Sequence, residues 1–441
     1  MSLLETAKGV FLDTLHHLRI EEAMRTRVHY QDETLHVGEF AYDLRDFERV
    51  VVISIGKAAA PMWEALRPEL EPALQRGQAI EGIVVGATMP REKDARVRFF
   101  QGSHPLPSQM SVDAAEAVLK LLGACDDRCL VFFLISGGAS AMIEKALDGS
   151  VTVEETEGFY RALIQSGLAI TQMNALRKHF SQVKGGRLAV AAQGAAHCTL
   201  LISDVPDSVL HVVGSGPSLP DPSTTEECRR IIDSNLDALN LSDKLLGYFR
   251  NLGLEETAKA DHPAFAKASW FSLLSSDDLC RLAGEKAARL GFHVVVDNRC
   301  DDWDYGDAAT YLLDRLQELC QQYPKVCLLS AGEVTVQLPA AHGVGGRNLQ
   351  FVLKCSRLIN ERKMKATVLS AGSDGVDGNS PAAGAVCDET TLARASSDGL
   401  DISAGLERFD SFPIFSALGD AIITGPTGNN VRDLRLLLSS A

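Results

Sequence analysis

The chain has 441 residues, of which 46% are apolar and 23% charged, so it is long enough for two folded domains and has the composition of a globular protein. Its 43 Lys and Arg residues against 58 Asp and Glu give a net charge of −15, which excludes nucleic acid as the expected partner because the field repels a phosphate backbone. A small anion such as ATP is not excluded, since a local group of cations can outweigh the global charge in a narrow site.

The ten cysteines are scattered without a C-x-x-C pair, and we predict that they are reduced core residues. The first residues lack the basic and apolar regions of a secretory signal. The longest apolar run, residues 129–135, is far shorter than the ~18 residues of a membrane helix. These features predict a cytoplasmic protein that has no membrane partner, and they leave open its assembly as a homo-oligomer.

Buried strands alternate with helices along the first 240 residues. The strands are predicted at 51–55, 82–86, 98–100, 130–135 and 200–203, and helices begin near 58, 111, 152 and 224. The helix at Thr152 is marked by Glu155, three residues later, which completes a T-x-x-E capping box. This alternation predicts a largely parallel sheet covered by helices.

A charged helical stretch, 241–263, separates this part from a second run of alternating elements. Further strands are predicted at 268–274, 292–297, 326–330, 334–336, 367–371 and 421–424, and a helix opens after 343–347. We therefore expect an α/β protein of two domains, 1–245 and 265–441.

Glycine-rich loops with polar side chains follow seven of these strands, at the edge of the sheet where α/β proteins bind ligands. The simpler explanation of any one loop is that glycine makes a tight turn, but seven such loops favour a binding site. Lys57 follows Gly56 after a buried strand, where it could reach a phosphate or carboxylate or be a solvated loop lysine. The loop after the strand at 130–135 supplies backbone N–H groups and hydroxyls for an anion through Ser136, Gly137, Gly138 and Ser140.

Other charged residues are candidates of the same kind. Arg177 and Lys184 lie in a short basic stretch, which otherwise would be a solvated face. Arg347 follows two glycines at a helix start, where a guanidinium could stabilise a transferring phosphoryl group. Carboxylates that could hold Mg²⁺ or accept a proton, or else be turn residues, stand on comparable loops at Asp204, Glu333, Asp374 and Asp377.

Several familiar sites have no support in the sequence. A nicotinamide-binding G-x-G-x-x-G, a Walker A motif and the G-x-S-x-G of a hydrolase are all absent. The histidines have no zinc-ligand spacing. Pattern alone therefore indicates a two-domain α/β protein with a site for a small anion.

The motifs resemble the type 2 glycerate kinases over nearly the whole chain and in the same order. The N-terminal half resembles their kinase domain at 54–58, 102–105, 136–141, 173–179, 184–187 and 203–206. The C-terminal half is similar to their MOFRL domain at 332–336, 345–348, 371–378, 424–427 and 430–431. The ordered set is far more specific than any one motif.

This resemblance implies a Rossmann-like three-layer α/β/α domain, a C-terminal α/β MOFRL domain and an active site in the cleft between them. It implies transfer of the γ-phosphoryl group of ATP to the C2 hydroxyl of D-glycerate, with Mg²⁺ as the metal. Lys57, Arg347 and Asp204 are then expected to be catalytic, and Asp204, Glu333 and Asp374 to provide the metal ligands or the base. The residues expected to bind substrate or nucleotide are Gly56, Ser136, Gly137, Gly138, Ser140, Arg177, Asn348 and Asn430.

The chain departs from the family pattern in two places. Asp207-Ser208 stand where the family usually has Gly-Asp, and Leu349-Gln350 stand where it usually has Gln-Glu, which removes one acid. Two other functions stay open. One is an NAD(P)H-dependent hydroxypyruvate reductase, a label that some relatives have carried, and the other is an anion-binding relative without turnover. A kinase acting on a different short hydroxy acid is a third alternative.

Overall fold

The computed structural model describes residues 2–192, 194–203, 205, 207–251, 254–428 and 430–440. The chain forms two compact units, of which unit 1 comprises 1–19 and 275–441 and unit 2 comprises 20–274. The predicted domains, 1–245 and 265–441, differ from these units in two places: residues 1–19 belong to the C-terminal unit, and unit 2 extends to residue 274. The first helix belongs to unit 1 because it packs on the sheet of that unit, and the strand at Ala268–Leu274 belongs to unit 2 because it pairs with the sheet there.

Unit 2 contains a six-stranded sheet in which every neighbouring pair is parallel. Its order is β6 (Val97–Gln101), β5 (Ala79–Gly86), β4 (Arg49–Ile55), β7 (Cys129–Ile135), β8 (Ala196–Ile202) and β9 (Ala268–Leu274). Numbered along the chain from β4, this is the 3-2-1-4-5-6 order of doubly wound dinucleotide-binding folds. Strands β7 and β8 are buried along their whole length, as expected for central strands covered on both faces.

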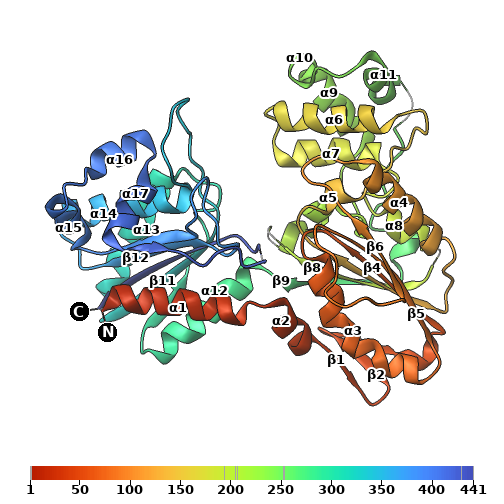
Figure 1. Cartoon of the computed structure of the whole chain (residues 1–441), viewed down its shortest axis with the longest axis horizontal. Coiled ribbons are helices and arrows are strands. Elements are labelled where there is room, and N and C mark those ends of the chain that lie inside the picture. Colours follow the sequence, from red (N-terminus) through yellow and green to blue (C-terminus); the bar gives the residue numbers. More distant parts are fainter. Residues whose placement is uncertain are drawn as a thin grey trace. The chain divides into compact units, whose positions relative to one another are not determined.

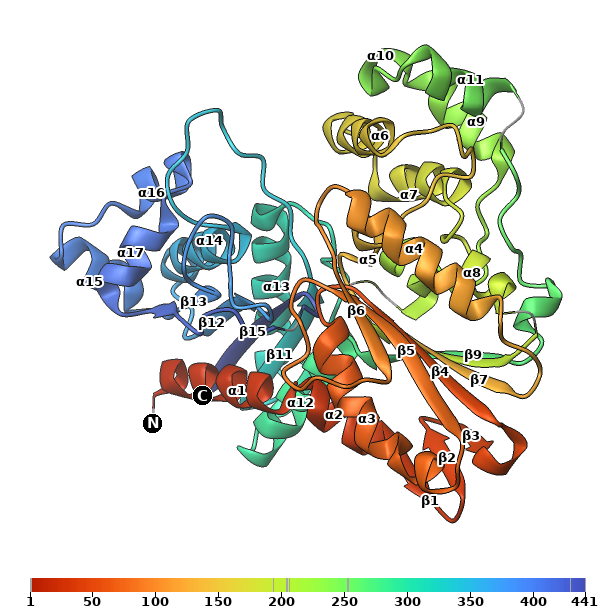
Figure 2. The same cartoon turned by 45° about the vertical axis from the view of Figure 1, so that its right-hand side comes forward.

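Helices cover both faces of this sheet (Figure 2). Those of unit 2 are α2 (Ile20–Arg27), α3 (Ala59–Gln75), α4 (Gln109–Leu122), α5 (Ala139–Met142), α6 (Val153–Gln165), α7 (Ile170–Phe180), α8 (Arg187–Ala191), α9 (Thr225–Ser234), α10 (Leu236–Leu239) and α11 (Asp243–Asn251). Helices α4 and α8 pack on one face and α3 on the other. Helices α6, α7, α9, α10 and α11 form a helical group with its own core of aromatic rings (Figure 1).

The capping box predicted at the start of α6 is confirmed. The Thr152 hydroxyl accepts a hydrogen bond from the backbone N–H of Glu155 at 3.2 Å, and the Glu155 carboxylate accepts one from the N–H of Thr152 at 2.8 Å. Three short antiparallel strands that the sequence analysis did not predict precede the main sheet. They are β1 (Val28–Gln31), β2 (Thr34–Val37) and β3 (Phe40–Asp43), and short 3-10 turns occur as η1 (Leu44–Asp46), η2 (Asp207–Ser215) and η3 (Pro263–Phe265).

Unit 1 contains a mixed six-stranded sheet. Its order is β10 (His293–Val296), β11 (Lys325–Gly332), β15 (Asp433–Ser440), β12 (Thr367–Gly372), β13 (Gly384–Cys387) and β14 (Ala421–Ile422). Strand β15 runs antiparallel to both β11 and β12, so the carboxyl ends of β11 and β12 and the amino end of β15 meet at one edge. The strand predicted at 334–336 is not formed, and Thr335 makes only an isolated bridge with Asp304.

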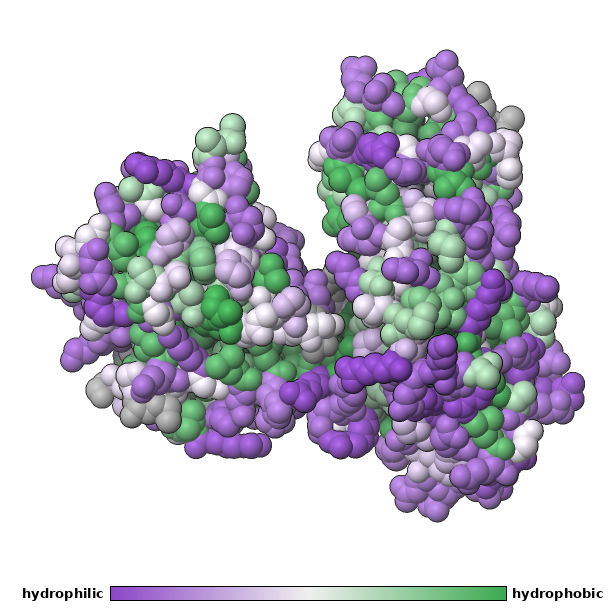
Figure 3. All heavy atoms as spheres, in the orientation of Figure 1, coloured by the Kyte–Doolittle hydropathy of each residue, from purple (hydrophilic) through white to green (hydrophobic). Residues whose placement is uncertain are grey.

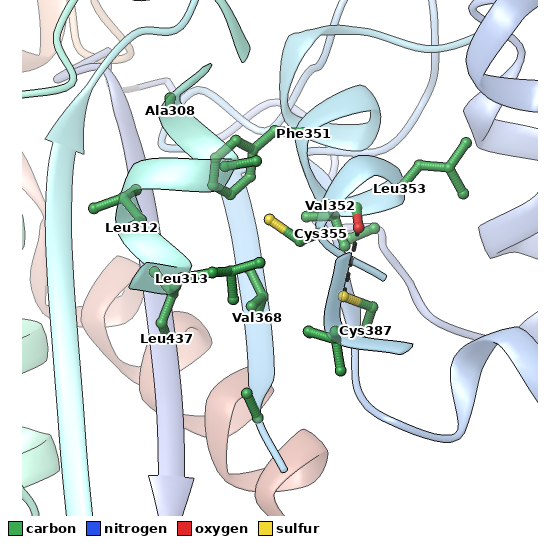
Figure 4. Packing of buried hydrophobic residues seen from close by; sticks show 14 of the residues in the cluster. Ala308, Leu312, Leu313, Phe351, Val352, Leu353, Cys355, Val368, Cys387 and Leu437 are labelled. Carbon is green, nitrogen blue, oxygen red and sulfur yellow. Dashed lines mark hydrogen bonds between the residues drawn. The ribbon is translucent and has the colours of Figure 1, made fainter. Parts of the chain in front are cut away.

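Helices α1 and α12 pack on one face of this sheet and α13 and α14 on the other (Figure 1). The helices of unit 1 are α1 (Leu3–His17), α12 (Ser276–Arg289), α13 (Tyr305–Cys320), α14 (Arg347–Arg362), α15 (Thr391–Ser397), α16 (Ile402–Arg408) and α17 (Ser411–Leu418). Leu312 and Leu313 of α13 and Phe351 of α14 meet Val368 and Leu437 of the strands in the core of this face (Figure 4). This packing fixes the start of α14, where Arg347 lies.

Nine of the ten cysteines are buried and all ten are unpaired, as predicted. Within the described ranges, no helix combines the length and apolar character needed to cross a bilayer. On each unit, the face drawn in Figure 3 presents mostly hydrophilic side chains, and smaller apolar patches are scattered among them.

Candidate functional site

The candidate site in unit 2 lies where the order of the sheet reverses. Strands β4 and β7 are neighbours at the centre, and the chain proceeds from β4 to β5 on one side and from β7 to β8 on the other. Ligands in doubly wound folds bind at this reversal, outside the carboxyl ends of the strands. The two loops that meet there are 56–58 after β4 and 136–140 after β7.

These two loops are held together by a close backbone approach and by two hydrogen bonds. Gly56 has a φ of +126°, and a Cβ atom at this position would lie 2.3 Å from the hydroxyl oxygen of Ser136. That hydroxyl accepts a 3.0 Å hydrogen bond from the backbone N–H of Ala58, and the N–H of Lys57 donates to the carbonyl of Gly137 at 2.9 Å. Gly56 and Ser136, both predicted as ligand-binding residues, therefore fix the backbone that carries Lys57.

Lys57, Gly138 and His104 lie side by side at the open end of these loops. A Cβ atom on Gly138 would be 3.2 Å from Cγ of Lys57 and 3.4 Å from Cδ2 of His104. The N–H groups of Gly137 and Gly138 donate no hydrogen bond to any described residue. A cation and unpaired N–H donors in one place form a suitable environment for an anion.

Arg177 adds a second cation, from the buried side of α7. The residue is 9% exposed, its Nε is buried without an acceptor, and no described carboxylate lies within ion-pairing distance of it. Burial together with the charges of Lys57 and Arg177 lowers the pKa of His104, so this imidazole is neutral at pH 7. A buried cation without an anionic partner is costly, and an anionic ligand would compensate it.

A chain of polar side chains connects the loop to the helices behind it. The hydroxyl of Ser140 lies 2.9 Å from that of Ser215, which donates to the Asn174 carbonyl oxygen at 3.1 Å. Tyr160 donates from its hydroxyl to the carbonyl of Ser140 at 3.1 Å and also bonds the carboxylate of Glu144. The sequence analysis missed Tyr160, Glu144 and Ser215 as site residues, because nothing in their local pattern distinguishes them from ordinary core and loop residues. Asn174 lies within the motif 173–179 but was not singled out as a site residue.

The basic stretch from Arg177 to Lys184 is not the solvated face that was the alternative expectation. Lys184 is fully buried and bonds Glu144 at 2.8 Å, while Lys178 is 2% exposed and pairs with Asp221 at 2.8 Å. Burial lowers the pKa of both lysines, and the carboxylates opposite them keep the pairs together. The cations of this stretch are thus divided between structural ion pairs and the unpaired Arg177.

In unit 1, Arg347 lies at the edge where β11, β12 and the start of β15 meet. Its guanidinium donates from Nε to Asp433 at 2.6 Å and from Nη2 to the other oxygen of Asp433 at 3.1 Å, and it pairs with Glu333 at 2.8 Å. The sequence analysis assigned Arg347 to a transferring phosphoryl group, and in the structure two carboxylates hold its guanidinium. Asp433 is 2% exposed, and its position at the start of β15 gave no signal in the sequence.

Asp377 and Asn348 support the start of α14. The Asp377 carboxylate accepts hydrogen bonds from the N–H groups of Asn348 at 3.1 Å and Leu349 at 2.8 Å, an approach that Gly346 permits because a Cβ there would lie 2.4 Å from Asp377. Asn348 is 1% exposed and its amide group bonds Asp377 and Ser370. The side chain of Asn348, which the sequence analysis predicts to bind a ligand, contributes to the position of the helix start.

Asp374, like Asp377, has no ion pair among the described residues. It accepts a 3.1 Å hydrogen bond from the N–H of Val376, and burial together with the charge of Asp433 raises its pKa. Asn430, predicted to contact a ligand, is exposed and accepts a bond from the N–H of Arg432 at 3.2 Å. Asp204 lies outside the described residues, so the structure does not place that predicted catalytic and metal-binding side chain.

The donor set at this edge suits Mg²⁺. No three described His, Cys, Asp or Glu side chains are grouped to hold a metal by themselves, but Mg²⁺ in phosphoryl-transfer sites is usually held by one or two carboxylates together with phosphate oxygens. Asp374 fits that requirement, because a bound cation would offset the repulsion from Asp433. Glu333 is less suited, since its charge is compensated by Arg347.

A pocket of about 420 Å³ in unit 1 adjoins this edge. Arg347, Asp374 and Gln350 line it together with apolar side chains. The fold and these residues define an α/β protein with a candidate anion site at the reversal point of one sheet and, in the other unit, a pocket beside a charged sheet edge.

Comparison with known proteins places this arrangement in a family. Residues 6–249 match the family described as Domain of unknown function (DUF4147), and residues 326–433 match the MOFRL family. Glycerate 2-kinase from Pyrococcus horikoshii is 31% identical to the chain over 404 residues, which cover 88% of each protein. A protein from Agrobacterium vitis, provisionally named hydroxypyruvate reductase, is 34% identical over 397 residues, covering 88% of this chain and 99% of its own.

Among solved structures, the crystal structure of glycerate kinase from Thermotoga maritima matches with a TM-score of 0.83 at 27% identity and covers 99% of both chains. The chain therefore belongs to the glycerate kinase family with a C-terminal MOFRL domain. It is a kinase, as the sequence resemblance implied.

Proposed function

We propose that the protein transfers the γ-phosphoryl group of ATP to the C2 hydroxyl of D-glycerate, giving 2-phosphoglycerate and ADP. The observation that carries the proposal is the buried Arg177, which has no anionic partner among the described residues and lies near Lys57 and His104. Glycerate is small and has one carboxylate and two hydroxyls, so it matches a compact site made of cations, N–H groups and hydroxyls.

In this proposal, the guanidinium of Arg177 binds the substrate carboxylate. The hydroxyls of Ser140 and Ser215 and the free N–H groups of Gly137 and Gly138 hydrogen-bond its polar groups. The neutral imidazole of His104 can accept a hydrogen bond from a substrate hydroxyl. These contacts would restrict the substrate to one orientation before phosphoryl transfer.

We assign to Lys57 and Arg347 the role of neutralising the negative charge on the transferring phosphoryl group. Phosphoryl transfer depends on positioning and charge compensation more than on covalent chemistry by the protein. Asp374 would hold Mg²⁺ and Asp204 is the other candidate for that role or for the base, as the sequence predicts. When bound, Mg²⁺ neutralises charge on the β- and γ-phosphates.

The test is ³¹P NMR of the purified protein with MgATP and D-glycerate, with each component omitted in turn. We expect a 2-phosphoglycerate resonance together with ADP in the complete mixture alone. A 3-phosphoglycerate resonance would move the transfer to the C3 hydroxyl. Intact ATP in a folded sample would contradict the proposal.

A reductase is the second candidate, because the Agrobacterium relative is provisionally named for that activity. It predicts loss of NADH or NADPH absorbance with hydroxypyruvate in the absence of ATP. The same enzyme preparation serves both assays, so phosphoryl transfer without nicotinamide oxidation excludes the reductase.

A further inference from the structure

The pocket in unit 1 does not match glycerate in size or in character. Its volume of about 420 Å³ lies within the range of pockets for whole cofactors and drug-sized ligands. Val336, Leu338, Val376 and Phe409 provide apolar walls. Glycerate has only three carbons and four oxygens, so it would leave most of this space and most of the apolar walls without contact.

The apolar walls are accessible to a ligand. Leu338 is 54% exposed and Val376 is 41% exposed, although both line the pocket. Exposed apolar side chains around a pocket are typical of surfaces that contact a flat or apolar part of a ligand. The character of the pocket therefore favours a ligand with such a part.

Phe409 brings an aromatic ring to the pocket from a position that normally favours glycine. It follows the last residue of α16 with a φ of +50°, in the left-handed region that bulky residues rarely adopt. Its ring meets the edge of Tyr305 at a centroid distance of 6.1 Å. A bulky aromatic side chain at a position of such backbone strain points to a role for the ring itself.

Gln350 provides a polar group at the border of the same pocket. Its residue is 1% exposed, its Nε2 donates to the carbonyl of Leu406 at 2.8 Å, and its Oε1 has no partner among the described residues. The bond to Leu406 fixes which end of the amide is free. The free end is an acceptor, so it fits a hydrogen-bond donor on a ligand.

The charged end of the pocket suits a phosphate that carries a metal. Arg347 and Asp374 both line it, and Arg347 is one helical turn before Gln350 on α14. Glu333, Asp374 and Asp433 bring more negative charge than Arg347 brings positive. This balance disfavours a bare polyphosphate and favours its magnesium complex.

We propose that this pocket binds the nucleoside of MgATP, with the base against Phe409 and Leu338, a nucleoside donor on Oε1 of Gln350, and the phosphates toward Arg347 and Asp374. The assignment rests on the proposed function, since it deepens the kinase activity by naming where the nucleotide is held. It also divides the two substrates between two sites, because the cationic site at Arg177 is left for glycerate.

The test compares Phe409→Gly with Lys363→Gly in the full chain. Lys363 ends α14 with a φ of +53°, so its glycine variant relaxes the same kind of helix end but does not line the pocket. We expect Phe409→Gly to weaken MgATP binding about tenfold in calorimetry and to raise the KM for ATP similarly, with the KM for glycerate unchanged. Lys363→Gly should change neither value.

A second variant tests the same pocket independently, in case Phe409→Gly has a folding defect. Leu338→Ser alters an exposed side chain, so it should weaken MgATP binding while leaving the melting temperature unchanged. If product forms normally and both variants bind MgATP like the wild type, the pocket assignment is overturned while the kinase function stands. If MgATP binds and both variants weaken it but no glycerate is phosphorylated, the pocket assignment stands and the proposed function fails.

Two ATP analogues and omission of the metal test the remaining contacts. A loss of affinity with 2′-deoxy-ATP assigns the Gln350 contact to the ribose hydroxyl, and a loss with GTP assigns it to the adenine amino group. Equal affinity for all three nucleotides overturns that contact. We expect nucleotide binding to weaken when Mg²⁺ is removed, and unchanged binding would contradict the inferred charge balance.

Discussion

The guanidinium of Arg177 lies over the ring of Tyr160, with its Cζ atom 4.9 Å from the ring centroid. The ring is fixed because its hydroxyl bonds Glu144 and the carbonyl of Ser140. A cation over an aromatic face is partly stabilised without using its hydrogen-bond donors. Arg177 is thereby held in place with donors still available to a ligand carboxylate.

Arg177→Lys should raise the KM for glycerate by about tenfold or more while changing the KM for ATP little. Lysine keeps the charge but cannot present two parallel N–H donors to a carboxylate or stack as a planar group on Tyr160. Steady-state kinetics with each substrate varied would check this. Arg161→Lys on the exposed face of α6 is the matched control, and an unchanged glycerate KM in Arg177→Lys would remove Arg177 from the substrate site.

Lys57→Ala should lower turnover by ~10² to 10³ with little loss of stability, by analogy with the removal of other transition-state donors. The side chain is exposed and makes no ion pair with a described residue, so its truncation leaves no buried charge behind. Turnover at saturating substrates and the melting temperature are the two measurements. Lys93→Ala alters another exposed lysine and should behave like the wild type, whereas normal turnover in Lys57→Ala would refute its role.

Arg347→Ala should lose both turnover and stability, unlike Lys57→Ala. Removing the guanidinium leaves Asp433 buried without its partner, which typically costs about 3–5 kcal/mol. Adding Asp433→Asn removes the uncompensated charge, so the double variant should regain much of the stability but not the turnover. Urea unfolding and kinetics on the same samples separate these effects, and recovery of turnover in the double variant would count against a catalytic Arg347.

Asp377 should make the protein less stable as the pH rises from about 4 to 7. Burial and the nearby charge of Asp433 raise the pKa of Asp377 from 3.8 to about 7, so the folded state retains a proton that the unfolded chain releases in this range. The free energy of unfolding should then fall by at most about 1.4 kcal/mol per pH unit. Asp377→Asn should lose this slope, and equal slopes in both proteins would show that Asp377 ionises normally.

The titration of His104 should report the charge of the glycerate site. Its pKa is lowered by burial and by Lys57 and Arg177, so the NMR midpoint should lie below the ordinary value of about 6.5. Glycerate should raise the midpoint because its carboxylate offsets the two cations, and Lys57→Ala should raise it without ligand. His104→Gln identifies the resonance. A midpoint that glycerate does not move would place the carboxylate elsewhere.

Local sequence was sufficient for the elements that depend on local periodicity. The apolar runs of β4 and β7, the glycine loops after them and the capping box at Thr152 are each encoded within about ten residues. The loop residues Gly56 and Ser136 were also singled out correctly as belonging to one place, because the carboxyl ends of neighbouring parallel strands meet.

The partners of the charged groups could not be predicted in this way. Lys184 pairs with Glu144, 40 residues earlier, and Lys178 with Asp221, 43 residues later. The sequence shows four basic residues in one stretch but not which of them meets an acid. Arg177 is the one without a carboxylate partner among the described residues, and its proposed function rests on that observation.

By itself, the sequence determined the α/β class and the positions of β4, β5, β7 and β8 along the chain, because apolar periodicity and glycine turns act over short distances. The tertiary structure alone decided that β15 enters the sheet of unit 1 between β11 and β12, which brings Asp433 to Arg347 across 86 residues. Ion pairing and burial depend on which distant segments become neighbours, and only the folded chain specifies those neighbours.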